Sequence, residues 1–115
     1  MNIFKILDPQ GRRGAAVEFV PILFKAGTKT HRLALHQLSG GVWVVSDPES
    51  GGRICEVSGS LYGVRTSSRG AGPRAAARLA RKNLAELVKK VSADRFNARL
   101  KIARATYAEP VKVAQ

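Results

Sequence analysis

Residues 31–57 read HRLALHQLSGGVWVVSDPESGGRICEV, and this stretch indicates the fold most clearly. Residues 42–46 join β-branched and aromatic side chains without a break, which is typical of a strand. The tripeptide Ser39-Gly40-Gly41 before them is a tight hairpin signal, and residues 47–52 form a longer turn rich in Gly, with one Pro. The stretch therefore predicts a three-stranded antiparallel meander.

Side chains alternate within the first of these strands, residues 31–38. Leu33 and Leu35 are expected on one face, and Arg32 and His36 on the other. Because His36 lies close to the turn, we expect it to be a polar surface residue. The Leu face is then the one that joins the core.

The sequence before residue 31 predicts further strands. Ile3 to Leu7 is a short apolar run, and Ala15 to Phe24 is a longer one. Three apolar side chains of the longer run are expected on one face: Val17, Phe19 and Leu23. Pro21 cannot donate to a strand ladder, so this segment is expected at a sheet edge or at a bulge.

The hydrophobic period changes after Gly72, from about two residues to about 3.6. Pro73 suits the first position of a helix, where its missing N–H costs nothing. Residues 73–91 place one apolar stripe on a helix, made of Ala76, Ala80, Leu84, Leu87 and Val91. This stripe predicts a helix that packs on the sheet.

A second helical pattern covers residues 93–107. Its apolar side chains recur at spacings of four, three and four: Phe96, Leu100, Ala103 and Tyr107. The two stripes are out of phase by roughly 140°, and Ser92 is able to cap a new helix. We expect a break near residues 91–94, with a single bent helix as the alternative.

The fold class predicted is α+β. An antiparallel β-meander of about four to five strands over residues 3–57 precedes one long or two short C-terminal helices, at about 73–91 and 93–107. Residues 1–108 are expected to form a single domain, and residues 109–115 a flexible tail.

Residues 58–72 are expected to be mostly a Gly- and Ser-rich connector, with one short strand at Leu61 to Val64. Because the connector leads into the N-terminus of a helix, Ser67, Ser68 and Arg69 are candidates for contact with a phosphate group. The alternative is a plain linker between sheet and helix.

Charge is the second informative feature. The 115 residues hold 20 Lys and Arg against 8 Asp and Glu, a net charge of +12. Residues 1–57 carry seven basic and five acidic side chains, and residues 58–115 carry thirteen basic and three acidic ones. A field of this sign attracts polyanions to the second half of the chain.

These observations favour a non-catalytic nucleic-acid-binding or nucleic-acid-associated accessory protein that binds mainly through phosphate contacts. DNA and RNA are not distinguished. The candidate contact residues are Arg65, Arg69, Arg74, Arg78, Arg81, Lys82 and Lys89, with Arg12 and Arg13 as a second contact. The alternative is an adaptor or inhibitor that docks on an acidic protein surface.

Other classes are disfavoured. The single cysteine, Cys55, is expected to be a buried structural thiol, and His31 and His36 point to opposite faces of a strand, a poor arrangement for a metal site. No catalytic set is apparent, and we expect no enzyme activity, cofactor or metal. With neither an export signal nor a long apolar run, a cytoplasmic protein without membrane contact is expected. An edge strand or the C-terminal helix offers a route to a homo-oligomer.

Overall fold

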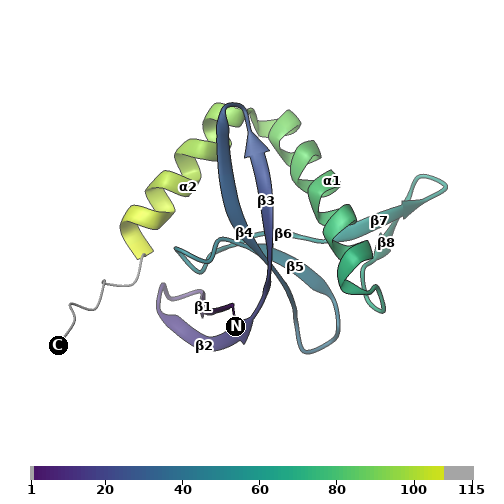
Figure 1. Cartoon of the computed structure of the whole chain (residues 1–115), viewed down its shortest axis with the longest axis horizontal. Coiled ribbons are helices and arrows are strands. Elements are labelled where there is room, and N and C mark those ends of the chain that lie inside the picture. Colours follow the sequence, from purple (N-terminus) through teal and green to yellow (C-terminus); the bar gives the residue numbers. More distant parts are fainter. Residues whose placement is uncertain (1, 108–115) are drawn as a thin grey trace.

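A four-stranded antiparallel sheet forms the centre of the fold (Figure 1). In the computed structural model, which describes residues 2–107, its strands follow one another in chain order. They are β3 (Val20–Ala26), β4 (Lys29–Gln37), β5 (Trp43–Ser46) and β6 (Arg53–Glu56). The predicted meander over residues 31–57 is confirmed, since β4, β5 and β6 pair in sequence.

Two helices cover one face of this sheet. The helices α1 (Pro73–Val91) and α2 (Ala93–Tyr107) diverge from a common corner (Figure 1). The main core lies beneath them, and its fully buried side chains include Leu33 and Leu35 of β4 and Leu84 of α1. The period change after Gly72 therefore predicted the two layers of the fold correctly.

The break between the helices occurs at Ser92, where φ is +80°. Its N–H donates to the carbonyl of Val88 at 2.8 Å and ends α1. Its Oγ accepts the N–H of Arg95 at 3.3 Å and caps α2. The prediction of two helices with Ser92 as the cap is confirmed.

The opposite face of the sheet is covered by a separate hairpin of β1 (Ile3–Leu7) and β2 (Arg13–Glu18). Phe4 and Phe19 pack there against Ala34 of β4 in a second, smaller apolar cluster. This cover also buries His36, which is 3% exposed, so the prediction of a surface histidine is wrong. The reason is that the β1–β2 hairpin packs on the His36 face of β4, and the local sequence of β4 gives no sign of this contact.

The run Ala15 to Phe24 contributes to two strands instead of one, because the chain turns out of β2 at Phe19 and enters β3 at Val20. This turn changes which residues face the core. Val17 and Phe19 share one apolar cluster as expected, but Ile22 is buried and Leu23 is 63% exposed, so the prediction is wrong for Leu23. The position at a sheet edge predicted from Pro21 is confirmed, since β3 is an outer strand.

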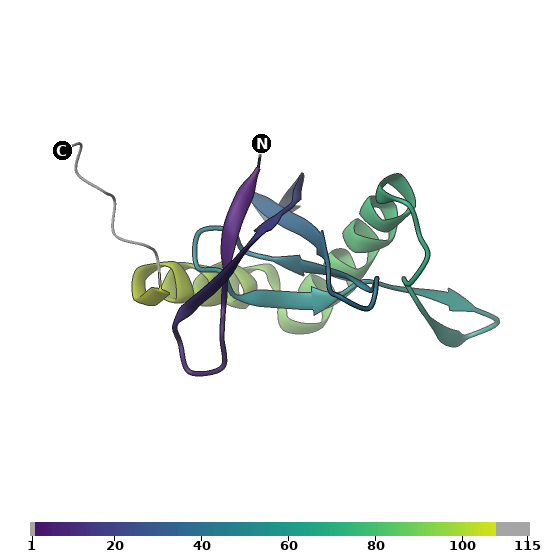
Figure 2. The same cartoon turned by 90° about the horizontal axis from the view of Figure 1, so that it is seen from below.

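A further hairpin follows the meander, made of β7 (Ser58–Leu61) and β8 (Val64–Ser67). It projects from the body of the molecule beside α1 (Figures 1 and 2). The expected short strand at residues 61–64 is wrong, because these residues span the turn of the hairpin. The expected tail at 109–115 lies outside the described residues. Within residues 2–107, neither helix combines the length and apolar composition that crossing a membrane requires.

Candidate nucleic-acid interface

The outer face of α1 carries a dense row of cations. Alanine and leucine favour the helix, and Pro73 occupies its first turn. The buried stripe of Ala76, Ala80 and Leu84 fixes which face meets the sheet. The predicted cations of this helix are all exposed on the other side: Arg74, Arg78, Arg81, Lys82 and Lys89. We call these five residues the basic face of α1.

Little negative charge lies near the basic face. Glu86 is the one acid of α1, and no acid occurs in the first turn of the helix. Among residues 2–107, the cations that form ion pairs are Arg65 and Arg104, and none belongs to the basic face. Like charges three and four residues apart repel one another mildly, so a bound anion would relieve this repulsion.

The β7–β8 hairpin lies along one flank of α1 and forms a groove with it. The groove has a volume of about 520 Å³ and contains three cationic side chains, from Arg65 on β8 and from Lys82 and Lys90 on α1. Glu56 and Glu86 also line it, and Arg65 pairs loosely with Glu56 at 3.9 Å. Lys82 belongs to the basic face and also lines this groove, so the two surfaces are continuous.

Asn83 attaches the hairpin to the helix. Its Oδ1 accepts the N–H of Ser58 at 2.8 Å, and its Nδ2 donates to the carbonyl of the same residue at 3.1 Å. Next to this contact, a side chain on Gly59 would meet Thr66 at 2.8 Å. Glycine at this position therefore allows β7 and β8 to pair closely near the base of the hairpin. Sequence reasoning missed Asn83, because the contact joins segments 25 residues apart.

Arg69 lies apart from the groove, against the β4–β5 turn at Gly40 and Gly41. Its neighbour Ser68 is 1% exposed, and the Oγ of Ser68 accepts the N–H of Trp43 at 2.9 Å. Ser68 thus has a structural role and is not available to a phosphate. Of the three candidates for phosphate contact in the connector, Ser67 and Arg69 remain. The Oγ of Ser67 already accepts the N–H of Arg69 at 3.1 Å.

The predicted second contact, Arg12 and Arg13, lies at the turn of the β1–β2 hairpin, away from the projecting β7–β8 hairpin (Figures 1 and 2). Arg12 is exposed. The guanidinium of Arg13 donates to three backbone carbonyls, those of Lys5, Glu49 and Tyr107. Arg13 therefore ties three segments together, and only Arg12 is free to meet a ligand there.

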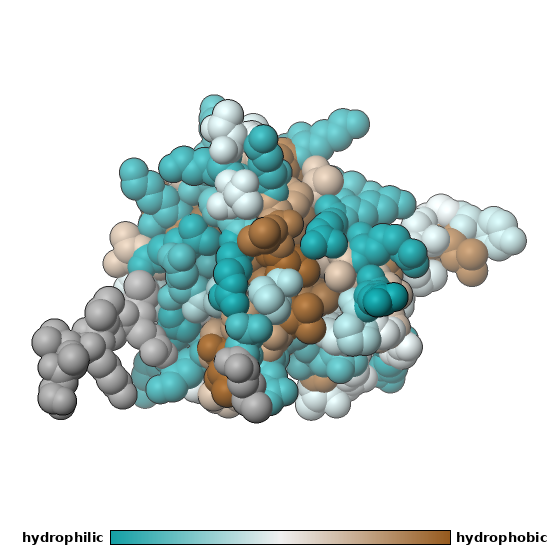
Figure 3. Space-filling view, viewed as in Figure 1, coloured by the Kyte–Doolittle hydropathy of each residue, from teal (hydrophilic) through white to brown (hydrophobic). Residues whose placement is uncertain are grey.

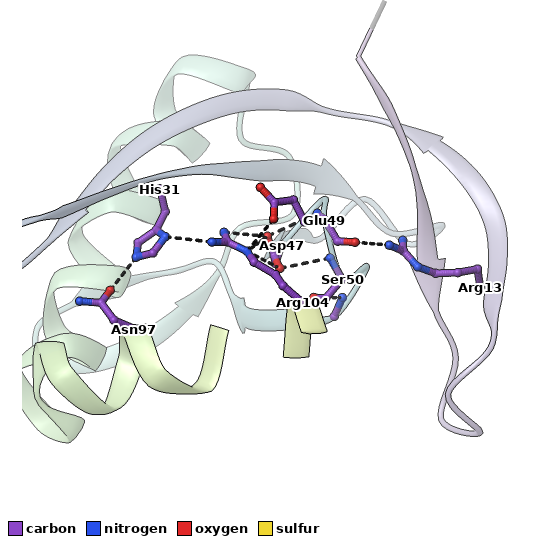
Figure 4. A network of polar contacts seen from close by, with 8 residues as sticks. Arg13, His31, Asp47, Glu49, Ser50, Asn97 and Arg104 are labelled. Atoms are coloured by element: carbon purple, nitrogen blue, oxygen red, sulfur yellow. Dashed lines mark hydrogen bonds and ion pairs between the residues drawn. The ribbon is translucent and has the colours of Figure 1, made fainter. Parts of the chain in front are cut away.

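A largely buried polar network attaches α2 to the sheet (Figure 4). Asp47, 1% exposed, accepts the N–H groups of Glu49 and Ser50, as expected for a turn aspartate. It also binds the guanidinium of Arg104, with the closest contact at 3.0 Å. Nη1 of Arg104 lies 3.4 Å from Nδ1 of His31. The sequence offered no signal for this pairing, which spans 57 residues.

The helix α2 adds exposed cations that the sequence-based set did not include: Arg95, Arg99 and Lys101. Arg99 also borders a hollow of about 240 Å³ between the two helices and β6. Leu87, Val91 and Phe96 form part of its apolar lining, and Arg53 also lines it, as does Asp47, whose carboxylate is paired with Arg104. An apolar side chain flanked by carboxylates matches this combination.

The remaining titratable groups have structural surroundings. Burial raises the pKa of the Cys55 thiol to about 11, which keeps it protonated and unreactive at neutral pH. Burial, and to a lesser degree Arg53, lowers the pKa of His36 to about 4. Within the part of the chain that the structure describes, no three His, Cys, Asp or Glu side chains group closely enough to hold a metal ion.

Comparisons of this chain with protein-family models, with curated proteins and with solved structures give no match.

Proposed function

We propose that this protein is a small, basic, non-catalytic nucleic-acid-binding domain that holds its ligand mainly through phosphate contacts. The observation that supports this most directly is the basic face of α1. Its five exposed cations have no ion-pair partner among residues 2–107, and a buried apolar stripe holds the helix in place behind them.

The spacing of the arginines suits a nucleic-acid backbone. Arg74, Arg78 and Arg81 lie within roughly 60° of one another around the helix and span about 10 Å of its axis. One strand of a duplex presents a phosphate about every 3.4 Å of helix axis, so about three phosphates fall within that length. Lys82 continues the surface into the groove beside the β7–β8 hairpin.

Binding of this kind has little sequence preference, because phosphates carry no base identity. It depends strongly on salt, because each neutralised phosphate releases condensed counterions. These two properties give the proposal its test.

The experiment measures the affinity for a random duplex over a range of salt concentrations. We expect the Arg74→Ala, Arg78→Ala, Arg81→Ala triple variant to flatten the slope of log K against log salt by about 0.9 per lost contact, or nearly 3 if all three touch phosphate. A matched control removes the same charge from exposed strand positions: Lys5→Ala, Lys25→Ala and Lys29→Ala. The control should leave the slope nearly unchanged.

Equal flattening by both triple variants would show that net charge alone attracts the duplex. An unchanged slope in a folded arginine variant would remove α1 from the binding surface. Either result contradicts the proposal as stated.

A second candidate function, docking on an acidic protein, is favoured by the hollow between the helices and β6. Its lining combines apolar side chains with Arg53 and Arg99, which suits an apolar side chain with carboxylates beside it. Failure of the wild-type protein to bind duplex at low salt would put this candidate ahead. The double variant Arg53→Glu, Arg99→Glu would then be expected to abolish capture of an acidic partner from nuclease-treated lysate.

A further inference from the structure

The outer end of the β7–β8 hairpin exposes apolar side chains that contribute little to the fold. Leu61 is 59% exposed, Tyr62 96% and Val64 66%. In Figure 3 a small brown patch lies on the projecting hairpin, apart from the brown surface at the centre of this face. A two-stranded hairpin is only marginally stable by itself, so apolar side chains left in water at its tip call for another explanation.

The backbone conformation at the tip also indicates that Tyr62 has a role outside the fold. Tyr62 and Gly63 are the two turn residues, and both have positive φ, +50° and +77°. Such a turn favours Asn followed by Gly, because Asn adopts this conformation more readily than an aromatic residue. Tyr62 is therefore a poor choice for the turn, and its ring contacts almost nothing in return. Strain of this kind, in an exposed residue, is a reason to look for a function.

The direction of the hairpin is fixed relative to the basic face of α1. Asn83 holds the backbone of Ser58 through two hydrogen bonds, and the groove between hairpin and helix is lined by Lys82 of the basic face. An apolar tip thus projects beside a surface suited to phosphates. This combination matches DNA-bending proteins, which hold the backbone with cations and insert an apolar wedge at a base step.

We propose that the tip of the β7–β8 hairpin inserts into the minor groove of duplex DNA, with the ring of Tyr62 placed against a base step, while α1 holds the neighbouring backbone. The inference rests on the proposed function. The axes of two paired strands lie about 4.8 Å apart, and the backbone atoms and side chains on either side make the ribbon wider than a minor groove of about 6 Å. Only the tip of the hairpin therefore enters. The minor groove of duplex RNA is wide and shallow and offers a wedge little depth, which favours DNA.

The test separates the ring of Tyr62 from the stability of the turn. Tyr62→Asn installs the preferred Asn-Gly turn and removes the ring, whereas Tyr62→Phe keeps the ring. We expect the thermal midpoint of Tyr62→Asn to equal or exceed that of the wild type. We expect its affinity for a 30-base-pair DNA duplex to fall by about 5- to 150-fold, the loss of one aromatic–base contact. Tyr62→Phe should bind within about 3-fold of the wild type, because it keeps the apolar ring.

Two further readouts distinguish this inference from the proposed function. The salt slope of Tyr62→Asn should match that of the wild type, since no phosphate contact is lost. Energy transfer between dyes at the two ends of the duplex should report bending by the wild type and by Tyr62→Phe, and much less by Tyr62→Asn.

The wild type could bind duplex DNA with a steep salt slope while Tyr62→Asn shows the same affinity and bending as the wild type. This result would overturn the insertion and leave the proposed function standing. An equal loss of affinity for single-stranded DNA, without bending of the duplex, would replace insertion by stacking on unpaired bases and so overturn it. A wild type that binds no duplex at low salt would overturn both proposals.

Discussion

Acid is expected to unfold this protein partly through one buried histidine. His36 lies between the central sheet and the β1–β2 hairpin, 3% exposed, with its ring centre 5.0 Å from that of Phe4. Its Nε2 is hydrogen-bonded with Ser46 Oγ at 2.8 Å, while Nδ1 is buried and has no partner among residues 2–107. A second proton on this ring would lack an acceptor and would place a charge near Arg53, so the folded state disfavours protonation.

The magnitude follows from the two pKa values. The pKa of His36 falls from 6.5 to about 4 on folding, through burial first and Arg53 second. Above pH 6.5 the ring is neutral in both states, and its contribution to the free energy of unfolding is complete. Below pH 6.5 the unfolded chain takes up the proton first, so stability falls until about pH 4. At about 1.36 kcal/mol per pH unit, the whole interval amounts to about 3 kcal/mol.

The assay compares urea unfolding of the wild type and of His36→Gln between pH 4 and pH 8. The other acid-sensitive groups are common to both proteins and cancel in the difference. The wild type should lose about 2–3 kcal/mol relative to the variant between pH 7 and pH 4. Parallel curves for the two proteins across this range would refute the reasoning.

Three further outcomes are expected. Leu84→Ala should lower the free energy of unfolding by about 2–5 kcal/mol, because it empties a fully buried site, whereas Leu61→Ala, at a site 59% exposed, should cost much less in the same urea titration. Arg104→Met should cost about 3–5 kcal/mol, because it leaves a buried carboxylate unpaired; a cost no larger than that of the exposed control Arg99→Met would contradict this. With a pKa of about 11, Cys55 should react with iodoacetamide at pH 8 far more slowly in the folded protein than in urea, and equal rates would be inconsistent with its burial.

Local patterns predicted the elements whose structure depends on local sequence. The strands of residues 31–57 and both helices follow the periodicity of their side chains, and the break at Ser92 follows from the phase of the two stripes. The α1 cations were predicted for the same reason, since a buried stripe determines the opposite face.

Contacts between distant segments could not be predicted in this way. His36 is buried by the β1–β2 hairpin, Arg104 finds Asp47 across 57 residues, and Asn83 finds Ser58 across 25. The β7–β8 hairpin was missed for a different reason. Its strands are short and rich in Gly and Ser, and its turn uses Tyr62 where Asn is usual.

The strand β4 is buried on both faces, by Phe4 and Phe19 on one side and by the two helices on the other. During synthesis the β1–β2 hairpin is available early, whereas the face of Leu33 and Leu35 stays uncovered until residues after 72 have been added. At about 5–20 residues per second, a nascent chain carries this open apolar face for seconds. Shortened chains that end before α1 should therefore aggregate or recruit chaperones, and completion of the helices should commit the chain to its folded state.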